Sequence, residues 1–462
     1  MPNIVIVHTD DTGRYIGPYG HAVDTPRLRS LAESGVTFRS AYCAGPTCSP
    51  SRGAMLTGQS PHSNGLIGLA HRGFSMDDYD RHLAGFLADR GLESVLVGQQ
   101  HEVEDDDPGS VLGYDRVLST DPDAVRDLPV DHSHTRRDLA SATAAAEYIQ
   151  EESDEPYFLS VGLYNTHKGF PMDQDSVDPD YVRTADPIPD RADFREEMAA
   201  YYAAVEYVDE CVGIVSDALR DTGQLADTLF VFTTDHGVAL PHMKCTLFED
   251  GTGISLIARF PDGTGASRGV AEDALVSNID LFPTICDLLD TDRPDWLEGS
   301  SVLPLVSGTV DSVRDEVFGE VTYHAAYEPK RCIRTQDYTY IRRYDDGEGV
   351  DDWHPDGRVP YIPANTDDGE AKQALVEDLI ERGRPREALY DRRLDPNERD
   401  DLADVAEYSD VRENLATRLD AWMRETDDPL LDGPVPKPNG AKVDRRDVLQ
   451  PGGDEAEEQN IR

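Results

Sequence analysis

Residues 43–58 read CAGPTCSPSRGAMLTG, a pattern that predicts a short helix with a nucleophile at its start. Ser49 can cap this helix, Pro50 suits its first position, and Gly58 supplies a left-handed stop about two turns later. Cys48 then lies just before the helix, where free amide groups and the positive end of the helix dipole favour an anion. The stretch therefore predicts a reactive cysteine at a helix N-terminus.

Arg52 adds a positive charge to this stretch. It lies four residues after Cys48, so one helical turn is predicted to return its guanidinium to the same side. A nucleophile, an anion-binding helix end and a cation are thus expected close together. The alternative is a buried cysteine that only packs beside a helix, which is common in proteins of mixed α and β structure. The rest of the chain has to decide between the two.

The chain carries a large excess of acidic residues. Its 462 residues include 91 Asp and Glu against 43 Lys and Arg, a formal net charge of −48. Such a charge excludes nucleic acid and anionic membranes as partners, because their phosphates would be repelled. It also destabilises a compact state at low salt, whereas molar salt shortens the Debye length to about 3 Å. We therefore expect a halophilic, salt-filled setting.

Cysteine usage and the N-terminus indicate the compartment. The six cysteines are too few and too scattered for a disulfide framework in a chain of this length, so free thiols are expected. The first residues, MPNIVIV, include no basic region and no cleavage site. No segment approaches the roughly 18 apolar residues of a membrane span. These features predict a cytoplasmic protein with no membrane partner.

Short apolar runs alternate with helical patterns in the first part of the chain. The predicted strands are residues 4–7, 36–38, 94–97, 157–161, 228–234 and 254–260. Helices are predicted between them, and the longest patterns lie at residues 136–151 and 194–221. Strands that alternate with helices form a large, mostly parallel sheet sandwiched by helices, so the predicted class is α/β.

The pattern changes near residue 316. Short alternating strands are predicted at 317–322, 330–334 and 338–344, and a helix at 410–426. This is typical of a smaller α+β domain with an antiparallel sheet and a helix. After residue 432, Pro, Gly and charged residues dominate. We therefore predict three parts, namely a large α/β domain that holds the active site at 1–315, a C-terminal α+β domain at 316–432 and a disordered tail at 433–462.

Polar residues directly follow several of the predicted strands. They are Asp10 and Asp11, His101, His167, and Asp235 and His236. Ligands bind outside the carboxyl ends of the strands in parallel sheets, so these side chains are predicted on one rim. Adjacent acids without a basic neighbour repel each other, and a hard cation relieves this repulsion. Each pair alone is more typical of solvated loop acids, but two pairs that converge with Cys48 predict a metal site.

The order of these motifs resembles that of the type I sulfatases, in the alkaline phosphatase-like superfamily, over roughly residues 1–305. It runs from Asp-Asp through Cys-x-Pro-x-Arg, Gly-x-x-His and a strand that ends in x-x-His to Asp-x-Gly. Other stretches resemble the heparan N-sulfatases (N-sulfoglucosamine sulfohydrolases) within that family. They are LTG at 56–58, HSNG at 62–65, LYD, DPNE and DL between 389 and 402, and WMRETDDP at 422–429. Several segments in the right order are more specific than one motif.

The resemblance implies a divalent metal ion and a modified nucleophile. The implied nucleophile is formylglycine, an aldehyde that a formylglycine-generating enzyme makes from Cys48. With it, the implied metal ligands are Asp10, Asp11, Asp235 and His236. The family metal is usually Ca²⁺. Mg²⁺ is a further possibility. His236 stands where near relatives have Asn, and imidazole is a softer ligand than an amide oxygen, so Mn²⁺ and Zn²⁺ also stay open.

The resemblance also implies catalytic roles. One hydroxyl of the hydrated aldehyde, ionised beside the cation and Arg52, attacks sulfur in line. His167 then protonates the leaving oxygen or nitrogen, and His101 takes a proton when the sulfate is expelled. Lys244, nine residues after Asp235, matches the position of a sulfate-binding cation. Lysine keeps the charge of an arginine there but lacks its bidentate fork.

Gln99 is the main departure from the family pattern. The family reads Gly-Lys-x-His, whereas residues 98–101 read Gly-Gln-Gln-His and lack the lysine that contacts sulfate and nucleophile. Loss of one such donor corresponds to roughly 10²–10³ in rate. Either another cation substitutes for that lysine, or the activity is weak or directed at a different ester.

Three functions follow from these motifs. The first is hydrolysis of a sulfate ester or N-sulfo group on a sulfated small molecule or glycan. The second keeps the fold and the metal but cleaves a phosphodiester or phosphonate ester. The third is a catalytically weak protein that binds glycans, with an unmodified Cys48 and a site weakened at Gln99.

Overall fold

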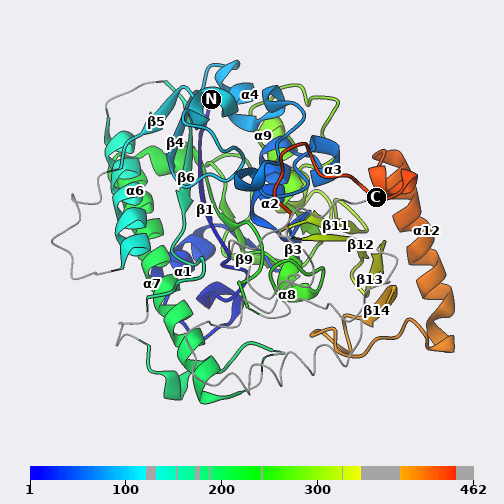
Figure 1. The fold of residues 1–462 in the computed structure, drawn as a ribbon. Coiled ribbons are helices and arrows are strands. Elements are labelled where there is room, and N and C mark those ends of the chain that lie inside the picture. Colours follow the sequence, from blue (N-terminus) through cyan, green and yellow to red (C-terminus); the bar gives the residue numbers. More distant parts are fainter. Residues whose placement is uncertain are drawn as a thin grey trace.

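A computed structural model describes residues 1–120, 132–151, 155–171, 177–186, 188, 190–240, 243–324, 326–344 and 385–443. A large sheet with helices on its two faces lies beside a smaller sheet and one long helix (Figure 1). The large sheet has eight strands in the order β5-β4-β6-β1-β7-β8-β2-β9. Their bounds are β1 Asn3–Thr9, β2 Val36–Phe38, β4 Glu93–Gly98, β5 Arg116–Leu118, β6 Tyr157–Leu163, β7 Thr228–Thr234, β8 Leu256–Arg259 and β9 Val270–Glu272.

The centre of this sheet is parallel. β1 pairs in parallel with β6 and β7, so that Val5 lies opposite Leu159 on one side and Phe230 on the other. β8 runs opposite to both of its neighbours, β7 and β2. A further parallel pair is formed by β3 (Ala41–Tyr42) and β10 (Val276–Ser277). The predicted α/β class, with a mostly parallel sheet, is confirmed.

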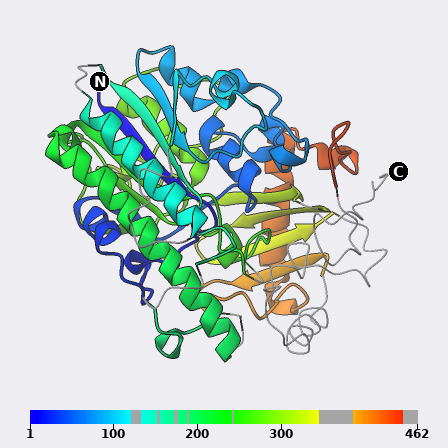
Figure 2. The same cartoon turned by 60° about the vertical axis from the view of Figure 1, so that its left-hand side comes forward.

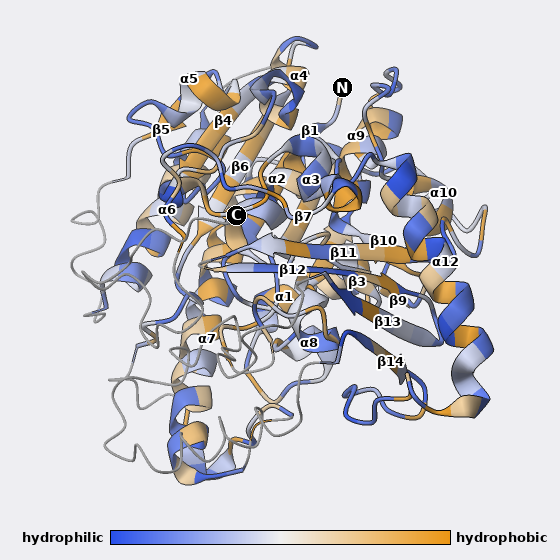
Figure 3. Ribbon diagram, turned by 45° about the vertical axis from the view of Figure 1, so that its right-hand side comes forward, coloured by the Kyte–Doolittle hydropathy of each residue, from blue (hydrophilic) through white to orange (hydrophobic). Residues whose placement is uncertain are grey.

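Both faces of the sheet are buried, which explains its continuous apolar strands. In β1, Val5 and Val7 belong to one hydrophobic cluster with α1, α6 and α7, whereas Ile4 and Ile6 belong to another with α2, α4 and α9. Figure 2 shows α6 and α7 lying across the first face, and Figure 3 shows the apolar strands inside. The α-helices of the described residues up to 306 are α1 Pro26–Ser34, α2 Cys48–Thr57, α3 Pro61–Asn64, α4 Leu83–Ala88, α5 Pro108–Leu112, α6 Ser133–Gln150, α7 Ala192–Asp221, α8 Glu249–Thr252, α9 Leu281–Leu288 and α10 Leu303–Val306.

The smaller sheet is antiparallel, as predicted. Its order is β11-β12-β13-β14, and the helix α12 (Ser409–Glu425) packs against β12 and β13. Three of its strands were predicted within a few residues, whereas β14 was not predicted. The strand bounds are β11 Val317–Tyr323, β12 Tyr327–Arg334, β13 Tyr338–Arg343 and β14 Glu387–Asp391.

The predicted tail begins with an ordered segment. Val435, Ala441 and Val443 are buried in the cluster formed by the small sheet and α12. Residues 444–462 lie outside the described residues. The boundaries at 315 and 432 stay predictions. Among the described residues, none of the helices combines the length and apolar character needed to cross a membrane.

Candidate active site

The carboxyl ends of four neighbouring strands position the predicted site residues. These strands lie in the order β4-β6-β1-β7. Each sends a short loop to the same rim of the sheet. The loops carry Asp10 and Asp11 after β1, His101 after β4, His167 after β6, and Asp235 and His236 after β7. The parallel register of the sheet thus brings together residues that are more than 200 positions apart in sequence.

Helix α2 places Cys48 beside this rim, but it starts earlier than predicted. Cys48 is its first residue and Thr47 its N-cap, and no side chain caps the helix. Ser49 instead accepts a hydrogen bond from the Ala70 N–H at 3.0 Å, so its predicted capping role is wrong. The C-terminal stop is as predicted, since Gly58 has φ of 70° in the left-handed region.

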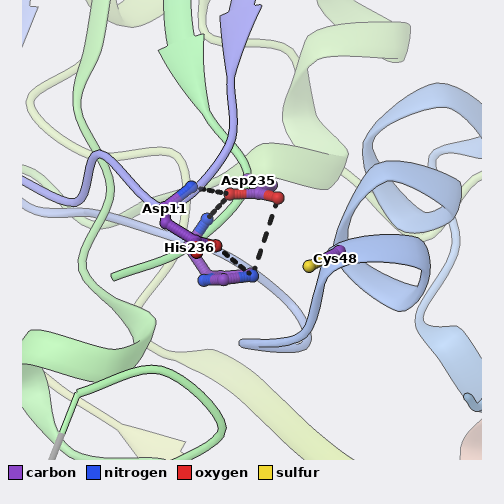
Figure 4. Close-up of side chains that lie close together, drawn as sticks. All are labelled: Asp11, Cys48, Asp235 and His236. Atoms are coloured by element: carbon purple, nitrogen blue, oxygen red, sulfur yellow. Dashed lines mark hydrogen bonds and ion pairs between the residues drawn. The ribbon is translucent and has the colours of Figure 1, made fainter. Parts of the chain in front are cut away.

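Four buried side chains from three elements form a compact cluster, drawn in Figure 4. One ligand atom from each of Asp11, Cys48, Asp235 and His236 lies within 4.8 Å of all the others. Asp235 Oδ1 fixes the loops by accepting from the Asp11 N–H at 2.9 Å and the His236 N–H at 2.8 Å. The bond from the Asp11 N–H supports Asp11 at a left-handed φ of 56°, which is uncommon for a residue other than glycine. A second such group joins Asp10, Cys48 and His101.

His236 presents a free ring nitrogen to this cluster. Its Nδ1 donates to the Gly237 carbonyl at 2.9 Å, which leaves Nε2 as the nitrogen with a lone pair. Nε2 lies 3.4 Å from Asp11 Oδ1 and 3.6 Å from Asp235 Oδ2. Burial lowers the pKa of His236 to about 4, so the imidazole is neutral at pH 7. A neutral imidazole whose other nitrogen donates to a carbonyl is the usual form of a metal ligand.

Arg52 and Lys244 are each paired with carboxylates of the cluster. Arg52 is fully buried, and its Nη2 donates to Asp10 Oδ1 at 2.6 Å while its Nε lies 3.5 Å from Asp235 Oδ2. Lys244 Nζ donates to both oxygens of Asp11, at 2.9 and 3.0 Å. Arg52 is therefore directed at the acids of the rim.

The site combines three carboxyl groups, Asp10, Asp11 and Asp235, with two paired cations, Arg52 and Lys244, so a further positive charge can be accommodated. Burial opposes ionisation of Asp10 and Asp11, but Arg52 and Lys244 hold the pKa of each carboxyl below its usual range. Burial and the neighbouring Asp10 raise the pKa of Asp235 well above its usual range. Several buried side-chain atoms of the site have no hydrogen-bond partner within the described structure, and those that can ligate a cation include Asp10 Oδ2, Asp235 Oδ2 and His236 Nε2. Such a set of unsatisfied oxygen and nitrogen donors fits a divalent cation.

Cys48 is a poor thiolate in this setting. Burial raises the pKa of its thiol well above the usual value, and the three aspartates of the rim raise it further, although Lys244 opposes them. Burial and the negative charge of the aspartates thus oppose the thiolate that was expected at the helix N-terminus. The geometry therefore gives no support to an unmodified cysteine that attacks as a thiolate.

Two histidines flank the cluster at its open side. His101 Nδ1 lies 3.5 Å from Asp10 Oδ1, and His167 Nε2 lies 3.9 Å from Asp11 Oδ2. Tyr164 holds His167 by stacking, with ring centroids 4.5 Å apart. Burial lowers the pKa of His167, although the nearby Asp11 opposes this shift.

A cavity of about 640 Å³ opens onto these groups. Of the predicted residues, Cys48, Gln99, His101, His167 and Lys244 line it. It also exposes residues that the sequence did not single out, among them Arg72, Glu104, Arg137, Tyr164 and His324. Tyr164 could have been found, because it directly precedes the Asn-Thr-His stretch at the end of β6. Arg137 lies on α6, and no local pattern marks it.

The comparison with known proteins decides the family. The profile of the Sulfatase family matches residues 2–291. The chain belongs to the sulfatase family. A second profile, described as N-sulphoglucosamine sulphohydrolase, C-terminal, matches residues 241–357, which extend beyond the described residues. The predicted family is thus confirmed, and the chain is a sulfatase-family enzyme that hydrolyses sulfate esters.

Relatives match nearly the whole chain. Human N-sulphoglucosamine sulphohydrolase is 28% identical over 487 residues, which cover 94% of this chain and 92% of that protein. An ulvan-active sulfatase of Formosa agariphila is 27% identical and covers 96% of this chain and 86% of its own length. A protein solved with its substrate D-glucosamine-2-N,6-O-disulfate shares the fold, with a TM-score of 0.67 at 17% identity, over 94% of this chain and 99% of that one.

Proposed function

We propose that this sulfatase-family enzyme hydrolyses a sulfate ester or N-sulfo group on a sulfated sugar, with formylglycine at position 48 and a divalent cation at the rim. The observation that carries the proposal is the cluster of buried, unsatisfied donors around Cys48. The preference for sugars is supported by the names of relatives, which act on glucosamine and ulvan sulfates. The order of the motifs and the two matching profiles support the modified cysteine.

The metal would be held by Asp10, Asp11, Asp235 and His236 beside residue 48. When bound, the cation would neutralise charge on the sulfuryl oxygens, and the hydrated aldehyde would supply a hydroxyl as the nucleophile. Three carboxylates favour Ca²⁺ or Mg²⁺, whereas the imidazole of His236 also accepts Mn²⁺.

The histidines and Lys244 carry the remaining roles. His167 lines the cavity, and its Nε2 is placed to donate a proton to the leaving oxygen or nitrogen when the imidazole is protonated, a form that Asp11 at 3.9 Å favours. His101, beside Asp10, is placed to accept a proton on the side of residue 48. Lys244 lines the cavity and brings positive charge to the sulfate while it holds Asp11. These side chains thus divide acid, base and anion binding among themselves.

The nature of residue 48 is the most informative test. Mass spectrometry of the peptide that contains residue 48, from natively produced protein, is expected to show the aldehyde or its hydrate. The metal content of the same preparation is expected to be close to one divalent ion per chain. Finding only the thiol would contradict the proposed nucleophile.

Turnover separates the sulfatase from the phosphodiesterase alternative. Steady-state kinetics with matched aryl sulfate and aryl phosphodiester substrates are expected to give a larger kcat/KM for the sulfate. Cys48→Ala serves as the control, because it keeps the fold but cannot be matured. Faster hydrolysis of the phosphodiester than of the sulfate by the wild type would contradict the proposed sulfatase activity.

A further inference from the structure

Arg137 is a cation of the cavity that the described acids do not neutralise. It is the fifth residue of α6, and its side chain lines the same cavity as Cys48, His101 and His167. In the described part of the chain, no carboxylate lies within salt-bridge distance of its guanidinium, which donates from Nη2 to Gln99 Oε1. It also lies over the ring of Tyr164, 5.8 Å from the centroid. Both of these partners are neutral, and the neighbouring Asp138 interacts with the charge of Arg137 without an ion pair, so most of that charge remains available to a ligand.

The other cations of the cavity are differently engaged. Arg52 and Lys244 are bound to the aspartates of the rim and compensate their negative charge. Arg72 is turned toward the C-terminal segment, where its Nε donates to the Lys442 carbonyl at 3.1 Å. A singly or doubly charged sulfate that enters the cavity is therefore attracted most strongly by Arg137, because no paired acid cancels the positive charge of this guanidinium.

Gln99 fixes where this guanidinium lies. Its Nε2 donates to the Gln100 carbonyl at 2.9 Å, which turns its Oε1 toward Arg137. Tyr164 lies between Arg137 and the catalytic histidines, since its ring stacks on His167 and meets His101 edge-on at 6.1 Å. A lysine at position 99 would repel Arg137, whereas a neutral amide oxygen holds it. The absent lysine and the unpaired arginine are thus two parts of one arrangement.

We propose that Arg137, oriented by Gln99, binds the oxygens of the reacting sulfate and takes the place of the missing lysine. This inference rests on the proposed function for its substrate. A guanidinium has five N–H donors in a planar fork, and Gln99 uses one of them, so donors remain for a tetrahedral oxyanion. Gln99 itself is a positioning residue that acts through Arg137.

The test compares Arg137→Gln, Arg137→Lys and the matched control Arg136→Gln. Arg136 is the neighbouring arginine on α6 and does not line the cavity. With a monosulfated aryl substrate, Arg137→Gln is expected to lose about 10²-fold in kcat/KM, as for one oxyanion donor. Arg137→Lys is expected to lose about tenfold, because it keeps the charge but not the fork. Arg136→Gln is expected to stay within about twofold of the wild type.

Calorimetric titration with inorganic sulfate keeps this test independent of turnover. Arg137→Gln is expected to weaken sulfate binding about tenfold or more. Gln99→Glu, which would pair Arg137 with an acid, is expected to weaken it similarly, while Gln99→Asn changes it less. If the wild type preferred the phosphodiester, the proposed function would fail, yet the difference in sulfate affinity would still support Arg137. Equal sulfate affinity of the wild type and Arg137→Gln, or no measurable binding by either, would overturn the role of Arg137.

Discussion

His236 contributes one nitrogen donor to a site that otherwise offers carboxylate oxygens. Its Nδ1 is committed to the Gly237 carbonyl, so only Nε2 faces Asp11 and Asp235. An asparagine at this position would offer a hard amide oxygen instead. Imidazole favours transition metals over Ca²⁺, and removing it should narrow the choice of ion.

We therefore expect His236→Asn to change metal selectivity more than fold stability. Mn²⁺ and Zn²⁺ should bind about tenfold more weakly, or about 1.4 kcal/mol, while Ca²⁺ affinity changes little. The affinities can be measured by the rise in Tm of chelator-treated protein as each ion is added, since ligands that bind the folded state stabilise it. An equal loss for all three ions would mean that His236 is not a selective ligand.

Asp138 supports the loop that carries His167, and its contribution to the free energy of unfolding depends on pH. Its Oδ2 accepts from the Tyr164 and Asn165 N–H groups at 2.8 and 2.7 Å, and burial raises its pKa to about 7. The unfolded carboxyl titrates near 3.9. Because the folded pKa is the higher one, the stabilisation is present below about pH 4 and is lost as the pH rises to about 7.

Asp138→Asn is expected to stabilise the protein at pH 8, by up to about 4 kcal/mol, and to change little at pH 4. The amide oxygen can still accept from the loop, so the activity at pH 6.5 should stay within about threefold of the wild type. Thermal unfolding at the two pH values checks this result. Parallel stability curves for the two proteins would show that Asp138 is not the titrating group.

At the residue scale, the sequence was enough to predict which residues lie on the rim, but not which of them form ion pairs. The polar residues after β1, β4, β6 and β7 could be predicted to meet, because the ends of parallel strands share an edge. That Arg52 and Lys244 pair with Asp10 and Asp11 depends on side-chain distances, which no periodicity encodes. The contact between Gln99 and Arg137 joins a strand end to a helix and was equally inaccessible.

Strands β4 and β6 approach closely where they reach the site. Gly98 and Gly162 are register partners, and the loop after β4 crosses directly over Gly162. A Cβ at Gly162 would lie 1.8 Å from the Gln99 carbonyl oxygen, so the backbone would have to move. This glycine is what lets Gln99 and His101 lie at the rim.

Gly162→Ala should therefore displace that loop. We expect a loss of about 2 kcal/mol in unfolding free energy and more than tenfold in kcat/KM. The added methyl group would clash with the Gln99 carbonyl, and a backbone group cannot move aside as a flexible side chain can. Gly85→Ala in α4 is the matched control. A Cβ there would meet its nearest neighbour only at 3.8 Å, so stability should hold or rise. Denaturant unfolding and kinetics of both variants decide the matter.

At the element scale, the buried parallel strands were the most predictable part of the fold. A run such as Ile4–Val7 is apolar throughout because the sheet is covered on both faces. The short outer strands β5 and β9 were not predicted, since three partly exposed residues carry little pattern. β14 was missed although it is mostly buried, because five residues are too short a run to assign from pattern alone. The start of α2 was misplaced because Ser49 and Pro50 mimic a cap, whereas the chain turns into the helix at Cys48.

Over the whole molecule, a largely buried ion cluster around Glu249 joins the two sheets. Glu249, at the start of α8, accepts from Arg14 at 2.5 Å, from Tyr42 at 2.9 Å and from Arg334 of β12 at 2.7 Å. Arg392, which follows β14, approaches it at 3.4 Å. Burial opposes ionisation, but Arg334 and the other guanidiniums hold the pKa of Glu249 well below its usual range. Unlike the exposed acids, such a cluster is little screened by salt.

Glu249→Gln is expected to loosen the small sheet from the large one. It removes the acid that Arg14, Arg334 and Arg392 share, although Arg334 keeps its pair with Glu398, so it should cost on the order of 3 kcal/mol at pH 7 in both low and molar salt. Since the folded pKa is depressed, the contribution of Glu249 is present above the unfolded pKa, about 4.3, and is lost as the pH falls below it. The stability curves of variant and wild type should thus converge toward pH 2. Asp190→Asn breaks an exposed pair with Arg195 and should leave Tm nearly unchanged. A stability difference that persists unchanged at pH 2 would exclude ionised Glu249 as the link between the sheets.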